Sequence, residues 1–106
     1  MKKTNDLSIA LLDSGVGGIS VLRELLRIMP AENYLYFGDS ANAPYGNRDR
    51  AEVLDITRKN LELLRSRGIK ALVIACNTAT SAAAAVLRRE NPDLLIIGID
   101  IFADFL

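Results

Sequence analysis

The chain has 106 residues, half of them hydrophobic, so it can bury one small core and is expected to form a single domain. Its 13 basic and 13 acidic residues balance, which argues against a nucleic-acid or membrane partner attracted by net charge. One cysteine excludes an internal disulfide and fits a reducing compartment, and the absence of histidine leaves acid–base chemistry to other groups. No apolar run approaches the roughly 20 residues that cross a bilayer, and no signal peptide is recognised, so a cytoplasmic location is expected.

The first half of the chain predicts two strand–helix units. Residues 8–12 form a short apolar run, which is typical of a buried strand, and apolar residues recur at helical spacing from 19 to 29. Pro30 marks the end of that helix. Residues 33–38 are aromatic and aliphatic and predict a second strand. The loop that follows, 39–47, is longer than a tight strand-to-helix connection needs, and such loops commonly carry function.

The second half continues the alternation of helix and strand. Residues 48–67 predict a long amphipathic helix, for which Gly68 fits the C-terminal cap. The run 71–75 is apolar without a period, which is typical of a parallel strand buried on both faces. The alanine-rich stretch 81–90 is a strong helix former, and residues 94–99 predict a fourth strand.

This order of elements predicts a single α/β domain over residues 1–106. Strands alternating with helices imply right-handed crossovers and a doubly wound, flavodoxin-like parallel sheet of about four strands, with helices on both faces. The expected strand order is 2-1-3-4, which puts the ligand-binding switch point between the first and third strands. Residues 1–6 are expected to be a disordered leader, and 100–106 form an atypical apolar tail.

The only cysteine, Cys76, follows the third strand and precedes a helix. A thiolate, the reactive form of the thiol, is stabilised at the positive end of a helix dipole. A lone cysteine at a strand end is also commonly a small buried hydrophobe. Asn77 and Thr78 are able to cap the helix or to hydrogen-bond a ligand. This run of small polar residues favours a functional thiol over a structural one.

Asp13 ends the first strand at the edge where Cys76 ends the third, and it opens the glycine-rich stretch 13–18. The glycine spacing differs from a dinucleotide fingerprint and the P-loop lysine is missing, but the backbone amides and the Ser14 hydroxyl suit a carboxylate or phosphate. Asp13 is interpreted either as a helix cap or as a group that governs protonation at the site. Tyr45 is interpreted either as a surface loop residue or as one that closes over a substrate.

Three stretches together resemble a known family. They are Asp13-Ser14-Gly15-Val16-Gly17-Gly18, Tyr36-Phe37-Gly38-Asp39 with Pro44-Tyr45-Gly46, and Cys76-Asn77-Thr78-Ala79-Thr80. In order and spacing they resemble the N-terminal half of glutamate racemase, from about residue 9 to residue 99. Aspartate racemases and related amino-acid racemases share the fold and a cysteine here, but the tyrosine loop favours the glutamate branch.

The resemblance implies a racemase that uses no metal and no other cofactor. One thiolate removes the α-proton of glutamate and a second thiol returns a proton from the opposite face, and the D-glutamate formed goes into bacterial peptidoglycan. Cys76 matches the first thiol, and Asp13 is implied as the second catalytic group of this half. The implied substrate-binding residues are Ser14, Pro44, Tyr45, Gly46, Asn77, Thr78 and Thr80.

The chain departs from the family in its length. Family members run to well over twice as long, with two α/β domains, and their second catalytic cysteine lies in the half without a counterpart here. We therefore expect a truncated enzyme that is inactive alone and that self-associates through its uncovered apolar faces. The alternative is a non-catalytic flavodoxin-like module that binds a small anion or an interaction partner.

Overall fold

The computed structural model describes residues 6–15 and 17–99. The expected tail 100–106 and all but Asp6 of the expected leader lie outside the described residues. The elements are β1 (Ser8–Asp13), α1 (Ile19–Ile28), β2 (Asn33–Gly38), two 3₁₀ turns (Ser40–Asn42 and Tyr45–Asn47), α2 (Arg50–Ser66), β3 (Ile69–Ile74), α3 (Asn77–Glu90) and β4 (Leu95–Gly98). None of the helices within these ranges is both long and apolar enough to span a membrane.

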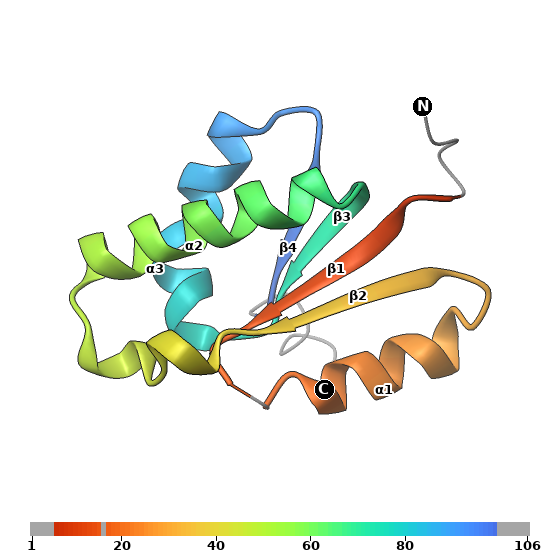
Figure 1. The fold of residues 1–106 in the computed structure, drawn as a ribbon, viewed down its shortest axis with the longest axis horizontal. Coiled ribbons are helices and arrows are strands. Elements are labelled where there is room, and N and C mark those ends of the chain that lie inside the picture. The colour runs from red at the N-terminus through yellow and green to blue at the C-terminus, as the bar shows by residue number, and fades with distance from the viewer. Residues whose placement is uncertain (1–5, 16, 100–106) are drawn as a thin grey trace.

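The four strands form one parallel sheet in the order β2-β1-β3-β4 (Figure 1), which confirms the prediction. At the end of β1, Asp13 lies opposite Gly38 of β2. On the other side of β1, Leu12 lies opposite Ile74 of β3. Since parallel strands all end at the same edge of a sheet, this register brings the loops after β1, β2 and β3 side by side.

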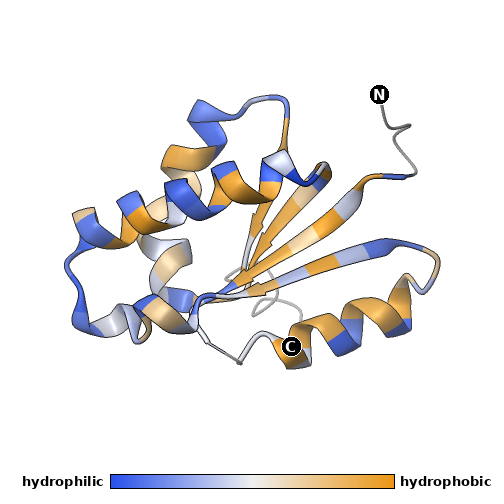
Figure 2. Cartoon of the chain, viewed as in Figure 1, coloured by the Kyte–Doolittle hydropathy of each residue, from blue (hydrophilic) through white to orange (hydrophobic). Residues whose placement is uncertain are grey.

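Helices cover both faces of the sheet, as expected for a doubly wound fold (Figure 1). On one face, α2 and α3 enclose the larger core, in which Leu12, Leu72 and Ile74 of the strands are fully buried. On the other face, α1 packs through Leu25. Figure 2 shows apolar residues concentrated along the strands. The central strands are covered on both sides, which explains why their sequences are apolar without alternation.

The third helix begins earlier than the sequence predicts, at Asn77 rather than at Ser81. Cys76 has the extended conformation of an N-cap, and its carbonyl oxygen accepts the first helical hydrogen bond, from the backbone N–H of Thr80 at 2.9 Å. The small polar residues after Cys76 are therefore the first turn of α3 and not a separate loop. The thiol consequently lies directly at the helix N-terminus.

The second helix has recognisable signals at both ends. The side chain of Asp49 accepts a hydrogen bond from the backbone N–H of Glu52, so the helix begins at Arg50 rather than at residue 48. At the other end Gly68 has φ 84°, a left-handed conformation that glycine adopts without a Cβ clash, and this confirms the predicted C-terminal cap.

A prediction for the core follows from the complete burial of Leu72 in β3. Leu72→Ala is expected to lower the free energy of unfolding by about 2–5 kcal/mol, because it removes buried methyl groups and leaves a cavity. The matched variant Leu63→Ala, at a side chain on α2 that is 43% exposed, is expected to cost less than about 1 kcal/mol. Urea denaturation of both variants measures the difference, and equal losses would contradict the described packing.

Candidate active site

The loops after β1, β2 and β3 converge at the carboxyl edge of the sheet and are tied to β1 by backbone hydrogen bonds. The N–H of Ala75 donates to the carbonyl oxygen of Leu12 at 2.8 Å. The N–H of Asp39 donates to the carbonyl oxygen of Asp13, also at 2.8 Å. Because β1 lies between β2 and β3, Asp13 is the central residue of this edge, with Asp39 on one side and Cys76 on the other.

The buried carboxylate of Asp13 organises the glycine-rich loop. Its Oδ1 accepts from the backbone N–H of Ser14 at 2.8 Å, and its Oδ2 accepts from the backbone N–H of Gly18 at 2.6 Å. The Tyr36 hydroxyl lies 3.0 Å from the same Oδ2 and 3.1 Å from the carbonyl oxygen of Gly15. Burial, and then the hydrogen bond to Asp13, raise the pKa of Tyr36 to about 12, so this hydroxyl remains a donor at neutral pH. Asp13 thus fixes the position of Ser14.

Cys76 contacts that same loop. Its side chain is 9% exposed, and its thiol donates to the Ser14 hydroxyl oxygen across 3.4 Å. As N-cap of α3, the thiol lies where the helix dipole favours a negative charge. The structure therefore brings three predicted site residues together, with Ser14 in contact with both Asp13 and Cys76. The thiol and the hydroxyl thus lie side by side at the edge of the sheet where ligands bind in this class of fold.

Tyr45 is only 2% exposed, so the interpretation as a surface residue is wrong. Its hydroxyl donates to Oδ2 of Asp39 at 2.6 Å and points to that carboxylate rather than to an open site. Pro44 and Gly46 on either side are exposed. Tyr45 and Gly46 are the first residues of a 3₁₀ turn, so their backbone N–H groups have no partner within that turn. A ligand contact from this loop is therefore available through its backbone.

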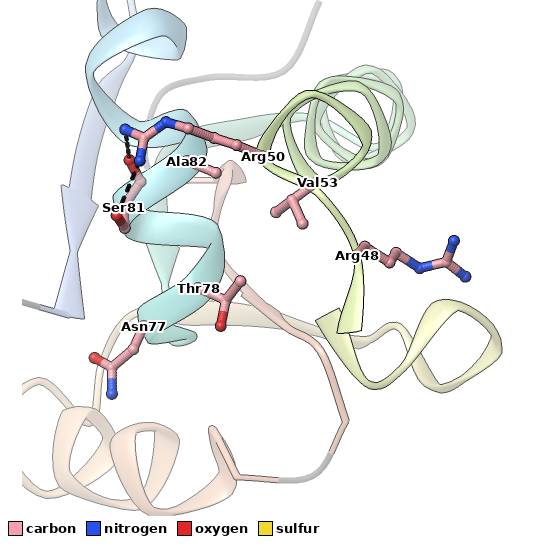
Figure 3. Close-up of a pocket in the computed structure, with 7 residues that line it drawn as sticks. All are labelled: Arg48, Arg50, Val53, Asn77, Thr78, Ser81 and Ala82. Carbon is pink, nitrogen blue, oxygen red and sulfur yellow. Dashed lines mark hydrogen bonds between the residues drawn. The ribbon is translucent and has the colours of Figure 1, made fainter. Parts of the chain in front are cut away.

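Asn77 and Thr78, in the first turn of α3, line a hollow of about 390 Å³ between α3 and the start of α2 (Figure 3). Arg50 closes one end, because its guanidinium donates to the carbonyl oxygen of Ser81 at 2.6 Å. Figure 3 shows the amide of Asn77 directed away from the helix. Both polar side chains are thus accessible next to Cys76, where the sequence predicts substrate contacts.

Thr80 is placed differently from the other predicted contacts. It is buried, its hydroxyl donates to the carbonyl oxygen of Ile74 at 3.3 Å, and the same oxygen accepts from the backbone N–H of Ile99 at 3.3 Å. The hydroxyl therefore joins the ends of β3 and β4. The arrangement gives a structural reason for Thr80 that needs no substrate.

Asn42 and Asn60, for which the sequence predicts no role, both donate to the Asp39 carboxylate, and Asn60 does so from α2. The spacing along α2 indicates that Asn60 faces the core, because it lies three residues after Thr57 and one before Leu61, both of which are buried. An amide on the buried side of a helix needs hydrogen-bond partners, and here they are Asp39 and Tyr45.

The fold and the site define a doubly wound α/β domain with a carboxylate, a hydroxyl and a thiol at its switch point. A glutamate racemase of Clostridium botulinum is 55% identical over 96 residues, which are 91% of this chain and 37% of that protein. The crystal structure of glutamate racemase from Thermus thermophilus matches with a TM-score of 0.86 and 42% identity, over 92% of this chain and 38% of that one. No protein-family model matches the chain.

A second solved structure, glutamate racemase isoform RacE1 from Bacillus anthracis, matches with a TM-score of 0.84 and 41% identity, over 90% of this chain and 35% of that one. The chain is thus homologous to the N-terminal part of the glutamate racemases, and this confirms the family expected from the three sequence stretches. It spans about 37% of the length of the curated relatives that it matches.

A prediction for the site concerns Gly38, at the end of β2. A Cβ at this position would lie 2.3 Å from the carbonyl oxygen of Gly15, so Gly38→Ala must displace the glycine-rich loop. We expect a loss of about 1–3 kcal/mol in the free energy of unfolding and an altered rate of Cys76 alkylation, because Ser14 moves with the loop. In Gly15→Ala the added Cβ has no neighbour within 4 Å, so this control is expected to match the wild type in both measurements. Wild-type behaviour of Gly38→Ala would contradict the described contact.

Proposed function

We propose that the chain forms one half of a glutamate racemase active site, in which Cys76 exchanges a proton with the α-carbon of glutamate. The observation that carries this proposal is the contact between the Cys76 thiol and the Ser14 hydroxyl, at the point where three loops converge. Homology to the N-terminal part of glutamate racemases supports the choice of substrate.

In the proposed reaction, the Cys76 thiolate takes the α-proton, and the electron pair of the broken C–H bond remains on the α-carbon. A second thiol on the opposite face then returns a proton, which gives the other enantiomer. Ser14 accepts a hydrogen bond from Cys76 when the thiol is protonated, and its hydroxyl is able to turn and donate to the thiolate. Asp13 acts through Ser14, whose backbone N–H it holds.

The two carboxylates of glutamate need donors on either side of Cys76. The backbone N–H groups of Tyr45 and Gly46 supply donors from the loop after β2. The side chains of Asn77 and Thr78 supply them from the first turn of α3. This division lets one substrate molecule bridge two loops while its α-carbon lies near the thiol.

The 106 residues contain no second cysteine. We therefore expect that this chain by itself supplies one of the two thiols and does not interconvert L- and D-glutamate. In this proposal no metal or other cofactor takes part, and the D-glutamate formed by the complete two-thiol site serves peptidoglycan synthesis in the cytoplasm.

The alternative is a module that holds a small anion in the glycine-rich loop. The arrangement around Asp13 supports it less well, because the Asp13 carboxylate already occupies the backbone N–H groups of Ser14 and Gly18. A buried negative charge at the centre of the loop also opposes a second anion there.

The proposed substrate site is tested by alkylation of Cys76 with iodoacetamide. The reagent reports on one thiol, because the chain has a single cysteine. We expect D- and L-glutamate to slow the alkylation, since a substrate bound between Tyr45 and Asn77 covers the thiol. Mass spectrometry of the labelled protein over time, at several glutamate concentrations, gives the protecting concentration.

Inorganic phosphate and succinate are the control ligands for this experiment. Phosphate carries charge without an amino acid, and succinate has two carboxylates without an α-amino group. Protection by phosphate alone would favour the anion-binding module. Labelling that is indifferent to glutamate would contradict the proposed substrate site.

Self-association is a further part of the proposal, because apolar side chains remain exposed on α1 and β4. Ile28 is 59% exposed, Leu95 is 61% exposed, and Ile19 and Leu26 of the predicted apolar stripe of α1 are also exposed. Apolar groups gathered on a surface favour association. Sedimentation velocity at micromolar concentration is expected to show a dimer or larger species, and Ile28→Glu is expected to weaken it. A clean monomer would contradict this expectation.

A further inference from the structure

Four polar side chains join the loop after β2 to helix α2. They are Asp39, Asn42, Tyr45 and Asn60, and together they are called the loop clamp here. Asp39 and Tyr45 are 5% and 2% exposed, so the centre of the loop clamp is buried. Asn60 is the only member that comes from α2, and the other three belong to the loop.

The members of the loop clamp donate hydrogen bonds to one another, and the Asp39 carboxylate is their shared acceptor. Asn60 Nδ2 lies 2.9 Å from Oδ2 of Asp39 and 3.1 Å from the hydroxyl oxygen of Tyr45. The Tyr45 hydroxyl donates to the same Oδ2 at 2.6 Å. Asn42 Nδ2 lies 3.1 Å from Oδ1 and 3.0 Å from Oδ2 of Asp39. Each donor therefore meets the same carboxylate.

The charge of Asp39 is stabilised by neutral donors. Within residues 6–15 and 17–99, Asp39 takes part in none of the ion pairs. Burial acts to raise the pKa of Asp39, but the hydrogen bonds from Tyr45, Asn60 and Asn42 outweigh it and hold the pKa below its ordinary value. A buried carboxylate depends on every one of its donors, so the loss of Asn60 affects the whole cluster.

The loop clamp is connected to the thiol through Tyr45. Tyr45 and Cys76 belong to the same buried cluster. Burial, and then the hydrogen bond to Asp39, raise the pKa of Tyr45, so its hydroxyl remains a donor at neutral pH. With the side chain held at its hydroxyl end, the backbone of Tyr45 and the adjoining Gly46 is also fixed. Their backbone N–H groups are the ones assigned above to a substrate carboxylate.

We propose that Asn60 is a positioning residue for this site. It fixes Asp39 and Tyr45, and through them it sets the direction of the backbone N–H groups of Tyr45 and Gly46. The inference rests on the proposed function for the identity of the ligand, glutamate. The other part of the inference, that the Asn60 amide on α2 orders the loop after β2, depends only on the hydrogen bonds of Asn60.

The test compares Asn60→Leu with the matched control Lys59→Leu. Both put leucine on α2, but Lys59 is solvent-exposed and contacts Asp55 on its own helix, outside the loop clamp. Two quantities are measured on the full chain, with unfolding followed in parallel to confirm that each variant is folded. The first is deuterium exchange of the backbone amides of residues 40–47. The second is the glutamate concentration that protects Cys76 from alkylation.

For Asn60→Leu we expect exchange in residues 40–47 to be faster by about tenfold, because one hydrogen bond to a buried charge is lost. The protecting glutamate concentration is expected to rise by about the same factor, while the alkylation rate without glutamate stays at the wild-type value. Lys59→Leu is expected to match the wild type in both measured quantities and in the alkylation rate without glutamate. A general loss of stability would instead speed exchange and alkylation throughout the chain.

Unchanged exchange in residues 40–47 of Asn60→Leu would overturn the inference, whatever glutamate does. Faster exchange with an unchanged protecting concentration would also overturn it, because the loop would then be ordered without consequence for the ligand. If glutamate fails to protect even the wild type, the proposed function fails, and the exchange measurement alone decides whether Asn60 orders the loop.

Discussion

The parallel pairing of β1 with β3 is the constraint on which the site depends. It places the backbone of Leu12 beside that of Ala75, and so Ser14 meets Cys76 although the two are 62 residues apart in sequence. The pairing is possible because β2 is reached by a crossover through α1 and leaves the other side of β1 free. Apolar strands buried on both faces then fix the register, since a slip would disturb both cores.

Two buried carboxylates lie at the edge of the sheet that this pairing forms, and their environments are alike. Asp13 and Asp39 lie at the ends of neighbouring strands, and each accepts a hydrogen bond from a tyrosine hydroxyl, of Tyr36 and Tyr45 respectively. Among the residues that the structure describes, neutral donors rather than arginine or lysine stabilise both carboxylates. Because hydroxyl and amide donors have directions, such carboxylates fix the loops around them more tightly than an exposed ion pair does. The accessible polar groups near Cys76 are thus held by buried ones.

The strand order and the position of Cys76 were predictable because they depend on local patterns, namely apolar runs, helix periodicity and the β-α alternation. The start of α3 was predicted too late, because Asn77 and Thr78 have low helix propensity, although they form the first turn after the N-cap residue Cys76. The burial of Tyr45 and the contact of Asn60 with Asp39 depend on how α2 packs against the loop. The sequence indicates that packing only weakly, through the spacing of Asn60 relative to the buried residues Thr57 and Leu61.

The central claim is that one glutamate molecule binds beside Cys76, between the loop after β2 and the first turn of α3. A titration of the ¹⁵N-labelled chain with D- and L-glutamate, followed by amide chemical shifts, tests it most directly. We expect the shifts of Ser14, Gly46 and Asn77 to change together, with one common dissociation constant, because a single ligand bridges Gly46 and Asn77 and covers the thiol that contacts Ser14. Shifts that stay unchanged, or that move with different constants in the three loops, would contradict it.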